Sequence, residues 1–279
     1  MPDELALVLL SCGGVVLALM LVSWVISVVL KDASIVDIVW GFGFVVVAWV
    51  AFATGDGYEG RKLLITALAT IWGLRLSIHL FNRNHGKGED YRYQAMRRYW
   101  GRRFPLISLV TVFALQGLLM FVVSLPLQVA QLSGTPDSFT IMDFIGAAVW
   151  LVGFGFESIG DLQLARFKAD PANAGKVMDQ GLWRYTRHPN YFGDAVLWWG
   201  IFLVAAARPA NLLVVISPIV MTVLLTRVSG VPLLEKSMTR RRAGYADYIA
   251  RTSSFFPRPP KPGRMTADHP DSSDTPPAS

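Results

Sequence analysis

The chain has 279 residues, of which 53% are hydrophobic and only 16% are charged. A soluble globular domain usually carries about 25% charged residues, so this composition excludes an ordinary soluble domain and favours a polytopic α-helical membrane protein. The formal net charge of +6 could indicate nucleic-acid binding, but membrane topology accounts for most of it, and we expect no nucleic-acid partner.

Apolar segments near the length of a bilayer crossing recur along the whole chain. We expect an all-α bundle of about seven transmembrane helices, at residues 5–30, 35–53, 63–82, 105–130, 141–160, 190–207 and 211–228. The last two segments are short, with Arg208 and Pro209 between them and Asn211 at the start of the second. A six-helix alternative, in which these two segments form a re-entrant hairpin, therefore remains open.

The distribution of basic residues predicts the orientation. With the N-terminus outside, 22 of the 26 lysines and arginines fall on the cytoplasmic side, counting Arg227 at the end of the last segment. The outside loops then hold three, Arg61, Lys62 and Arg208. We therefore expect the C-terminus in the cytoplasm.

The chain divides into a membrane domain at 1–256 and a tail at 257–279. The tail contains seven prolines among serine, aspartate and threonine and shows no apolar periodicity. This composition predicts a disordered cytoplasmic tail.

Ionisable side chains inside apolar helices are costly and are functional candidates by default. Three pairs have spacings that place both members on one helix face, namely Asp37 with Trp40, Arg75 with His79, and Glu157 with Asp161.

Structural alternatives exist for each pair. Asp37 could be an interfacial carboxylate, and Arg75 could extend to the membrane surface. Glu157 and Asp161 could be partly solvated at the end of their helix. An ion pair between Arg75 and one of the carboxylates is also open.

Residues 181–194, GLWRYTRHPNYFGD, concentrate polar and aromatic groups between two apolar segments. Arg184 and Arg187 could bind phosphates, together with Lys168. Pro189 should start a helix whose face carries Asn190, Asp194 and Trp198 at four-residue spacing, and these could hold a carboxamide-bearing ring such as nicotinamide. The alternative, a basic loop with an aromatic belt, does not explain Asn190 and Asp194 entering the bilayer.

Several familiar motifs are missing from the sequence. The glycines in GFG at 41–43 and 153–155 lack the third glycine of a dinucleotide fingerprint, and we expect them to permit close helix packing. The four histidines are scattered and there is one cysteine, so we expect no metal site.

Two C-terminal motifs read GLWRYTRHPNYFGD and PLLEKSMTRRRAGYADYIARTSSFFPRP, and two upstream motifs read DIVWGFGF and WGLRL…NRNHGKGEDYRY. Together they resemble a bacterial membrane family of formerly unknown function related to steroid 5-alpha-reductases. The resemblance covers roughly residues 30–260. It implies a seven-helix bundle in the bacterial inner membrane that binds NADPH from the cytosol. It also implies reduction of a carbon–carbon double bond conjugated to a carbonyl in a steroid-like or isoprenoid lipid.

The resemblance also implies roles for individual residues. Asp37 and Trp72 take the catalytic positions. The cofactor would be bound by Arg75, Glu157, Asp161, Lys168, Arg184, Arg187, His188, Asn190, Tyr191, Asp194, Trp198, Arg227 and Glu235.

One position departs from the pattern of the steroid enzymes. They polarise the substrate ketone with a glutamate and with a tyrosine three residues before the equivalent of Arg75, and this chain has Trp72 there. A tryptophan donates one N–H and cannot relay a proton. The resemblance to the steroid enzymes therefore supports the fold and the cofactor of this chain more firmly than its substrate.

Two other functions compete with the reductase. Membrane methyltransferases that use S-adenosylmethionine on a lipid or prenyl-cysteine also carry an R-H-P-x-Y element, but they typically place paired glutamates after the last helix, and this chain offers Glu235 alone. A non-catalytic sterol- or lipid-binding protein would keep an apolar cavity but has no need for the cationic groups around residue 184.

Overall fold

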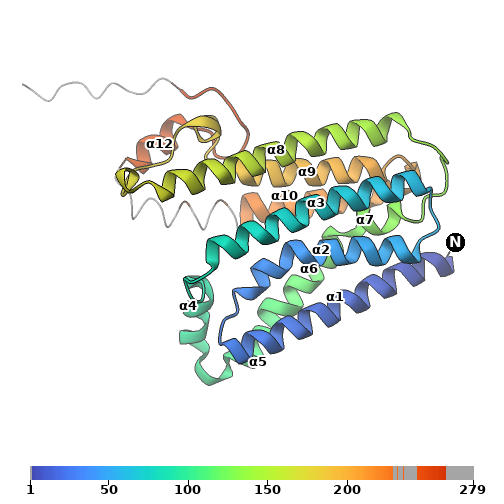
Figure 1. Cartoon of the computed structure of the whole chain (residues 1–279), viewed down its shortest axis with the longest axis horizontal. Helices are drawn as coiled ribbons and strands as arrows, with labels where there is room; N and C mark the ends of the chain where they lie inside the picture. The colour runs from blue at the N-terminus through green and yellow to red at the C-terminus, as the bar shows by residue number, and fades with distance from the viewer. Residues whose placement is uncertain (1, 229–230, 232–234, 236–243, 262–279) are drawn as a thin grey trace, which may run out of the picture.

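The computed structural model describes residues 2–228, 231, 235 and 244–261. In these residues the chain is all-α, and its long helices run side by side (Figure 1). Its principal helices are α1 (Pro2–Leu30), α2 (Ile35–Thr54), α3 (Glu59–Asn84), α4 (Tyr91–Trp100), α5 (Phe104–Ser108), α6 (Leu115–Val123), α7 (Leu125–Ala130), α8 (Ile141–Ala169), α9 (Pro189–Ala205), α10 (Ile216–Val223) and α12 (Tyr245–Arg251).

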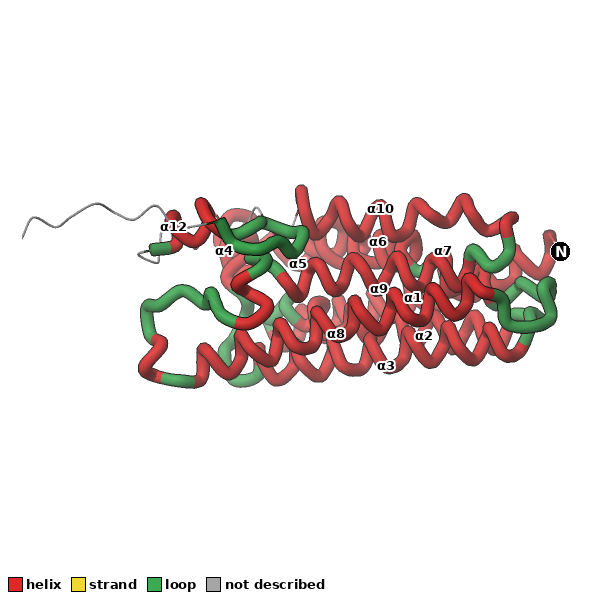
Figure 2. Tube along the Cα trace, turned by 90° about the horizontal axis from the view of Figure 1, so that it is seen from above, coloured by secondary structure: helices red, strands yellow, loops and turns green. Residues whose placement is uncertain are grey.

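Short helical turns complete the chain path. π-helical turns η2 (Leu109–Ala114) and η6 (Leu224–Val228) continue α5 and α10, and 3₁₀ turns form η1 (Gly101–Arg103), η3 (Pro171–Asn173), η4 (Gly181–Arg184) and η5 (Pro209–Val215). The N-terminus lies at one end of the bundle, and α4 and α12 lie at the other, which we call the α12 end (Figures 1 and 2).

The surface of the bundle is apolar while several charged groups are buried. Leu10, Val29 and Leu106 are at least 70% exposed, whereas Glu157 is 3% exposed. Six helical stretches in the described residues are long and apolar enough to cross a membrane: 3–30, 35–54, 59–84, 91–123, 141–169 and 209–228. The chain is therefore an integral membrane protein.

The count of six differs from the expected seven because of α9. This helix has 17 residues and is about 25 Å long, less than the roughly 30 Å of a bilayer core. It nevertheless runs along α8 (Figure 2), as an apolar helix with ten buried residues. The segments expected at 5–30, 35–53, 63–82, 141–160 and 211–228 form helix, whereas 105–130 is interrupted by a turn at Ser124. The orientation of the segments across the membrane remains a prediction.

Glycines set how closely the helices approach. A Cβ on Gly153 of α8 would lie 2.4 Å from the backbone N of Leu197, and one on Gly193 of α9 would lie 2.3 Å from the backbone N of Glu157. In the same way, a Cβ on Gly41 of α2 would lie 2.5 Å from the carbonyl oxygen of Gly73 in α3. A Cβ on Gly73 would lie 2.5 Å from the carbonyl oxygen of Gly41. These contacts confirm the packing role expected for Gly41 and Gly153.

Three aromatic rings join these helices in the middle of the bundle. The ring centroids of Phe44 and Trp198 are 4.8 Å apart, and those of Trp72 and Trp198 are 5.2 Å apart. All three side chains are fully buried. These tilted and edge-to-face contacts pack helices α2, α3 and α9 against one another.

Arg61 is a buried structural residue at the opposite end from α12. It is 0% exposed, and its guanidinium donates to both carboxylate oxygens of Asp143 and to backbone carbonyls in the 133–138 loop. One of the three cations assigned to outside loops is therefore neutralised within the fold.

The C-terminal segment folds back onto the body of the protein. The backbone N–H of Arg258 donates to Tyr185 O, and that of Lys261 donates to Arg251 O. Arg258 and Lys261 both fall in the segment 257–279, whose expected disorder remains a prediction. The remaining tail residues, 262–279, lie outside the described part of the chain.

The glycine contacts predict opposite effects for two neighbouring substitutions in α8. Gly153→Ala forces a methyl group against the backbone of α9 and should destabilise the bundle by about 1–3 kcal/mol. Gly155→Ala meets nothing within 4 Å and should be neutral or slightly stabilising, because alanine favours helix over glycine. Thermal unfolding of both variants in one detergent checks this, and equal melting temperatures would contradict the packing argument.

Candidate functional site

Arg75 connects two carboxylates of α8. Its Nη1 lies 2.6 Å from Glu157 Oε1, and its Nη2 lies 2.6 Å from Asp161 Oδ2. Glu157 also accepts a hydrogen bond of 2.9 Å from the indole N–H of Trp72. The ion pair left open by the sequence is thus present, and it holds α3 against α8 with charge-assisted bonds.

The same network reaches α9 through Asn190. Its Nδ2 donates to Asp161 Oδ1 at 3.0 Å, and this fixes the amide so that Oδ1 points elsewhere. His79 lies at the edge of the cluster, with its Nε2 3.6 Å from Asp161 Oδ2. The predicted helix start at Pro189 is confirmed, so Asn190 occupies the first turn of α9.

Three polar atoms on one face of α9 are buried and lack partners in the described structure. They are Asn190 Oδ1, Asp194 Oδ1 and Trp198 Nε1, at successive four-residue steps. The Trp198 indole lies near the Asp194 carboxylate, but the geometry between them is not that of a hydrogen bond. Buried polar groups are normally paired, so two acceptors and one donor in a row point to a polar ligand.

Arg187, expected at a phosphate, is instead a structural link. Its side chain is 8% exposed, and Nε donates to Glu235 Oε1 at 2.8 Å. Nη1 donates to the carbonyls of Ile249 and Thr252. Arg187 therefore ties the turn before α9 to the C-terminal segment.

His188 and Tyr191 join this second group. His188 Nε2 lies 3.2 Å from Glu235 Oε1, and its ring stacks on Tyr191 with 5.5 Å between centroids. Burial favours the neutral form of Glu235, but the hydrogen bonds from His188 and Arg187 outweigh it and lower the pKa of this carboxyl below its usual value.

Asp37 forms a third group near the α12 end. Its Oδ2 lies 2.6 Å from Arg92 Nη2, and its Oδ1 accepts a 2.8 Å hydrogen bond from the Tyr93 hydroxyl. Arg92 and Tyr93 lie in the first turn of α4, which folds back from the end of α3. One turn after Asp37, Trp40 packs on Phe44 of the aromatic core with 5.1 Å between ring centroids.

Two of the remaining predicted residues, Arg227 in η6 and Arg184 in η4, are exposed outside these groups. Lys168 is exposed near the end of α8, and its charge acts on His79 at the edge of the Arg75 cluster. The main cluster therefore contains Trp72, Arg75, Glu157, Asp161, Asn190, Asp194 and Trp198.

The sequence interpretation missed Arg92 and Tyr93 as partners of Asp37. Both lie in the motif GEDYRY that contributed to the family resemblance, but no spacing rule relates residue 37 to residues 92 and 93. Only the fold-back of α4 brings them together.

The lowered pKa of Glu235 predicts a pH-dependent stability. A carboxyl whose pKa is lower when folded stabilises the protein above its unfolded pKa, near 4.3, and this contribution is lost as the pH falls through the folded value. Glu235→Gln should therefore lower the melting temperature at pH 7, and its difference from wild type should shrink toward pH 4. The exposed Asp247→Asn in α12 is the matched control and should show no such difference. A Glu235→Gln effect that is independent of pH would contradict the assignment.

Comparison with known proteins gives a family without an assigned activity. Residues 23–252 match the family described as "Protein of unknown function (DUF1295)". The Uncharacterized protein C594.04c of Schizosaccharomyces pombe is 26% identical, with 85% of this chain and 76% of that protein covered. No solved structure matches the chain. Because the family match spans well over half of its length, the chain belongs to the DUF1295 family.

Proposed function

We propose that this protein is an integral-membrane, NADPH-dependent reductase of a carbon–carbon double bond conjugated to a carbonyl in a steroid-like or isoprenoid lipid. The observation that carries the proposal is the row of unpartnered polar atoms on α9, next to the Arg75 cluster. The resemblance to steroid 5-alpha-reductases supports it independently.

The row of atoms has the donor and acceptor pattern that a carboxamide requires. A nicotinamide carboxamide offers two N–H donors and one carbonyl acceptor. Asn190 Oδ1 and Asp194 Oδ1 are acceptors, and Trp198 Nε1 is a donor. These residues fit the nicotinamide group and would hold it, while Asp161 keeps the Asn190 amide in the orientation that leaves its oxygen available.

The Arg75 cluster has a positioning role in this proposal. Its guanidinium already binds Glu157 and Asp161, so its first task is to hold both carboxylates in place within an apolar interior. Trp72 is fully buried, and its N–H is donated to Glu157. Its catalytic role remains a prediction.

When bound, NADPH would supply a hydride to the β-carbon of the conjugated lipid. The chain must then donate a proton to the enolate oxygen. The resulting enol returns to the carbonyl form by taking a proton from water at the α-carbon and releasing the oxygen-bound proton. The Tyr93 hydroxyl donates its one proton to Asp37, and as the candidate donor it would rotate from Asp37 to that oxygen. Arg92 is paired with Asp37 and Asp90, and it would hold Asp37 in place. Trp40 and Phe44 provide apolar surface between this group and Trp198.

The location and orientation follow from the same proposal. The N-terminus would lie outside and the α12 end in the cytoplasm, where NADPH is available. The relative from Schizosaccharomyces pombe places related sequences outside bacteria, so the bacterial inner membrane remains a prediction for this chain.

One observation favours a second candidate, an S-adenosylmethionine-dependent methyltransferase. The Asp194 carboxylate near the Trp198 ring could pair with a cationic ammonium group as well as with an amide. Glu235 is engaged by Arg187 and His188, which occupy its carboxylate in the described structure. The two functions therefore differ first in the cofactor that binds.

Cofactor titration of purified protein in detergent separates the two functions. Saturable thermal stabilisation by NADPH, with none by S-adenosylmethionine, is the expected result. The opposite pattern would replace the reductase with the methyltransferase. If neither NADPH nor S-adenosylmethionine stabilised the protein, the result would count against both functions.

Variants of the α9 face test the site itself. Asn190→Ala and Asp194→Ala should each weaken NADPH binding by about tenfold or more, because each removes a buried hydrogen-bond acceptor worth roughly 1.5 kcal/mol. Trp198→Phe should weaken binding too. Trp199→Phe is its matched control, since that indole donates to Thr222 instead. Normal NADPH affinity in all three site variants would show that the site is elsewhere.

Tyr93→Phe tests the proton donor. It should lower the rate of reduction of a 3-oxo-4-ene steroid by about 10²-fold or more, with NADPH affinity unchanged. Tyr91→Phe changes an exposed tyrosine two residues earlier in α4 and should retain activity. Equal rates for the two variants would remove Tyr93 from the mechanism.

A further inference from the structure

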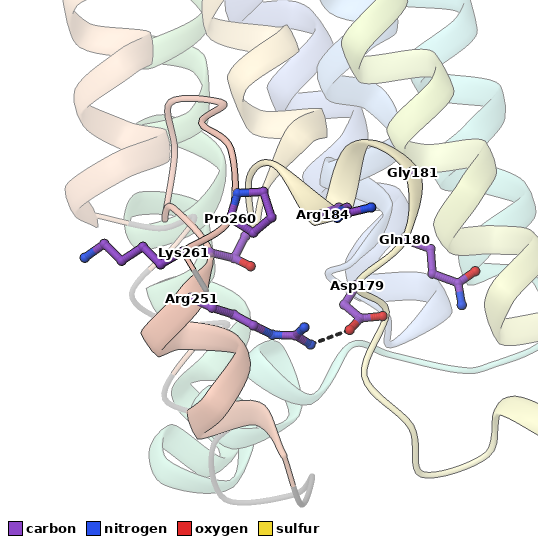
Figure 3. Close-up of a pocket in the computed structure, with 8 residues that line it drawn as sticks. Asp179, Gln180, Gly181, Arg184, Arg251, Pro260 and Lys261 are labelled. Carbon is purple, nitrogen blue, oxygen red and sulfur yellow. Dashed lines mark hydrogen bonds and ion pairs between the residues drawn. The ribbon is translucent and has the colours of Figure 1, made fainter. Parts of the chain in front are cut away.

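A cavity of about 530 Å³ lies at the α12 end, between η4 and the C-terminal segment (Figure 3). Its lining includes Asp179, Gly181, Arg184, Arg251, Thr252 and Lys261. None of these residues takes part in the Arg75 cluster or the unpartnered α9 face. The cavity is therefore a separate feature, and its volume lies in the range typical of small-molecule sites.

The walls of the cavity are fixed to each other. The Arg187 guanidinium donates to the carbonyl of Thr252, and the Thr186 hydroxyl donates to the carbonyl of Phe255 at 2.8 Å. Tyr248 donates its hydroxyl to the carbonyl of Trp183. These hydrogen bonds join residues 183–187, around η4, to residues 248–255 of the C-terminal segment. They hold the two sides of the cavity together.

The charge of the lining is positive. Arg184, Arg251 and Lys261 contribute three cations against the one carboxylate of Asp179. Figure 3 shows the Arg251 guanidinium directed at Asp179, with which it forms an ion pair, while the side chain of Lys261 extends away from that pair. Among the described residues, no carboxylate pairs with Arg184.

The Arg251–Asp179 pair is open to competition. The two side chains are 43% and 33% exposed, and an ion pair in such a position contributes little to stability. A ligand with more negative charge than one carboxylate can therefore bind Arg251 without a large loss. Two guanidinium groups beside one cavity favour a phosphate, because each can form paired hydrogen bonds to its oxygens.

We propose that this cavity binds a phosphate monoester, held by Arg184 and Arg251, with Asp179 as an internal competitor. The cavity is larger than phosphate alone, so the ligand has a body beyond it: a phosphorylated nucleoside or the headgroup of an anionic lipid. Arg184 was expected at a cofactor phosphate, so a nucleotide in this cavity would extend the reductase proposal, whereas the cavity itself is inferred from its own lining.

The test uses the full chain in lipid nanodiscs and adenosine 2′-phosphate as the soluble probe, with adenosine as its uncharged counterpart. Calorimetry should show saturable binding of adenosine 2′-phosphate and none of adenosine. Arg184→Gln should weaken it at least tenfold. Asp179→Asn should tighten it about threefold or more, because it frees Arg251 and removes a negative charge.

A second arm distinguishes the two sources of phosphate. Nanodiscs containing phosphatidic acid are compared with phosphatidylcholine alone, and thermal stability is followed for wild type and Arg184→Gln. Stabilisation by phosphatidic acid that Arg184→Gln abolishes, without binding of adenosine 2′-phosphate, assigns the cavity to a lipid headgroup. Binding of the soluble probe assigns it to a nucleotide.

Two controls keep the proposal separable from the α9 site and from general charge effects. Arg102→Gln removes an exposed arginine in η1 and should leave all binding unchanged. Asn190→Ala should bind the probe like wild type. The proposal is overturned if neither probe binds, if the Arg184 and Asp179 variants bind like wild type, or if either control reproduces the Arg184 effect.

Discussion

The two buried carboxylates of α8 impose the constraint on which the rest of the site depends. Glu157 and Asp161 lie one turn apart in an apolar bundle, where two uncompensated negative charges would be very costly. Arg75 from α3 meets both with one planar fork. Ion pairs at such depth are weak evidence for stability, since apolar replacements are often as stable. Their consequence here is geometric, because the pairing fixes the rotation of α3 and α8 about their axes.

The position of α9 follows from a different kind of contact. Gly153 and Gly193 allow the backbones of α8 and α9 to approach so closely that no side chain would fit at either position. This closeness brings Asn190 within 3.0 Å of Asp161, and the hydrogen bond between them fixes which way the amide faces. The unpartnered oxygen of Asn190 is thus a consequence of helix packing and of the Arg75 network together. Removing either would change the orientation of the unpartnered polar atoms on α9 without replacing the residues that carry them.

Much of the architecture could be predicted from the sequence because helical periodicity is a local property. Pro189 marked the start of α9, and the four-residue spacing of Asn190, Asp194 and Trp198 was sufficient to place them on one face. The partners of Arg187 could not be found this way. Its basic neighbours indicated a phosphate contact, whereas the structure buries it against carbonyls more than sixty residues later. A charged residue beside an apolar segment looks the same in sequence whether it faces solvent or another part of the chain.

The tryptophan at position 72 is best understood together with Tyr93. Trp72 fills the space beside Phe44 and Trp198 and uses its one N–H to bind Glu157, so it has no further donor to offer. The Tyr93 hydroxyl of α4 likewise donates its one proton to Asp37, but a hydroxyl can rotate to another acceptor, whereas an indole N–H is fixed by its ring. In the proposed reductase, the proton donor therefore comes from a helix that folds back after α3, and α3 contributes packing and the Arg75 ion pair. The acid and the cofactor face are then held by different contacts, α4 on α2 and α8 on α9, so each can be altered by mutation while the other stays in place.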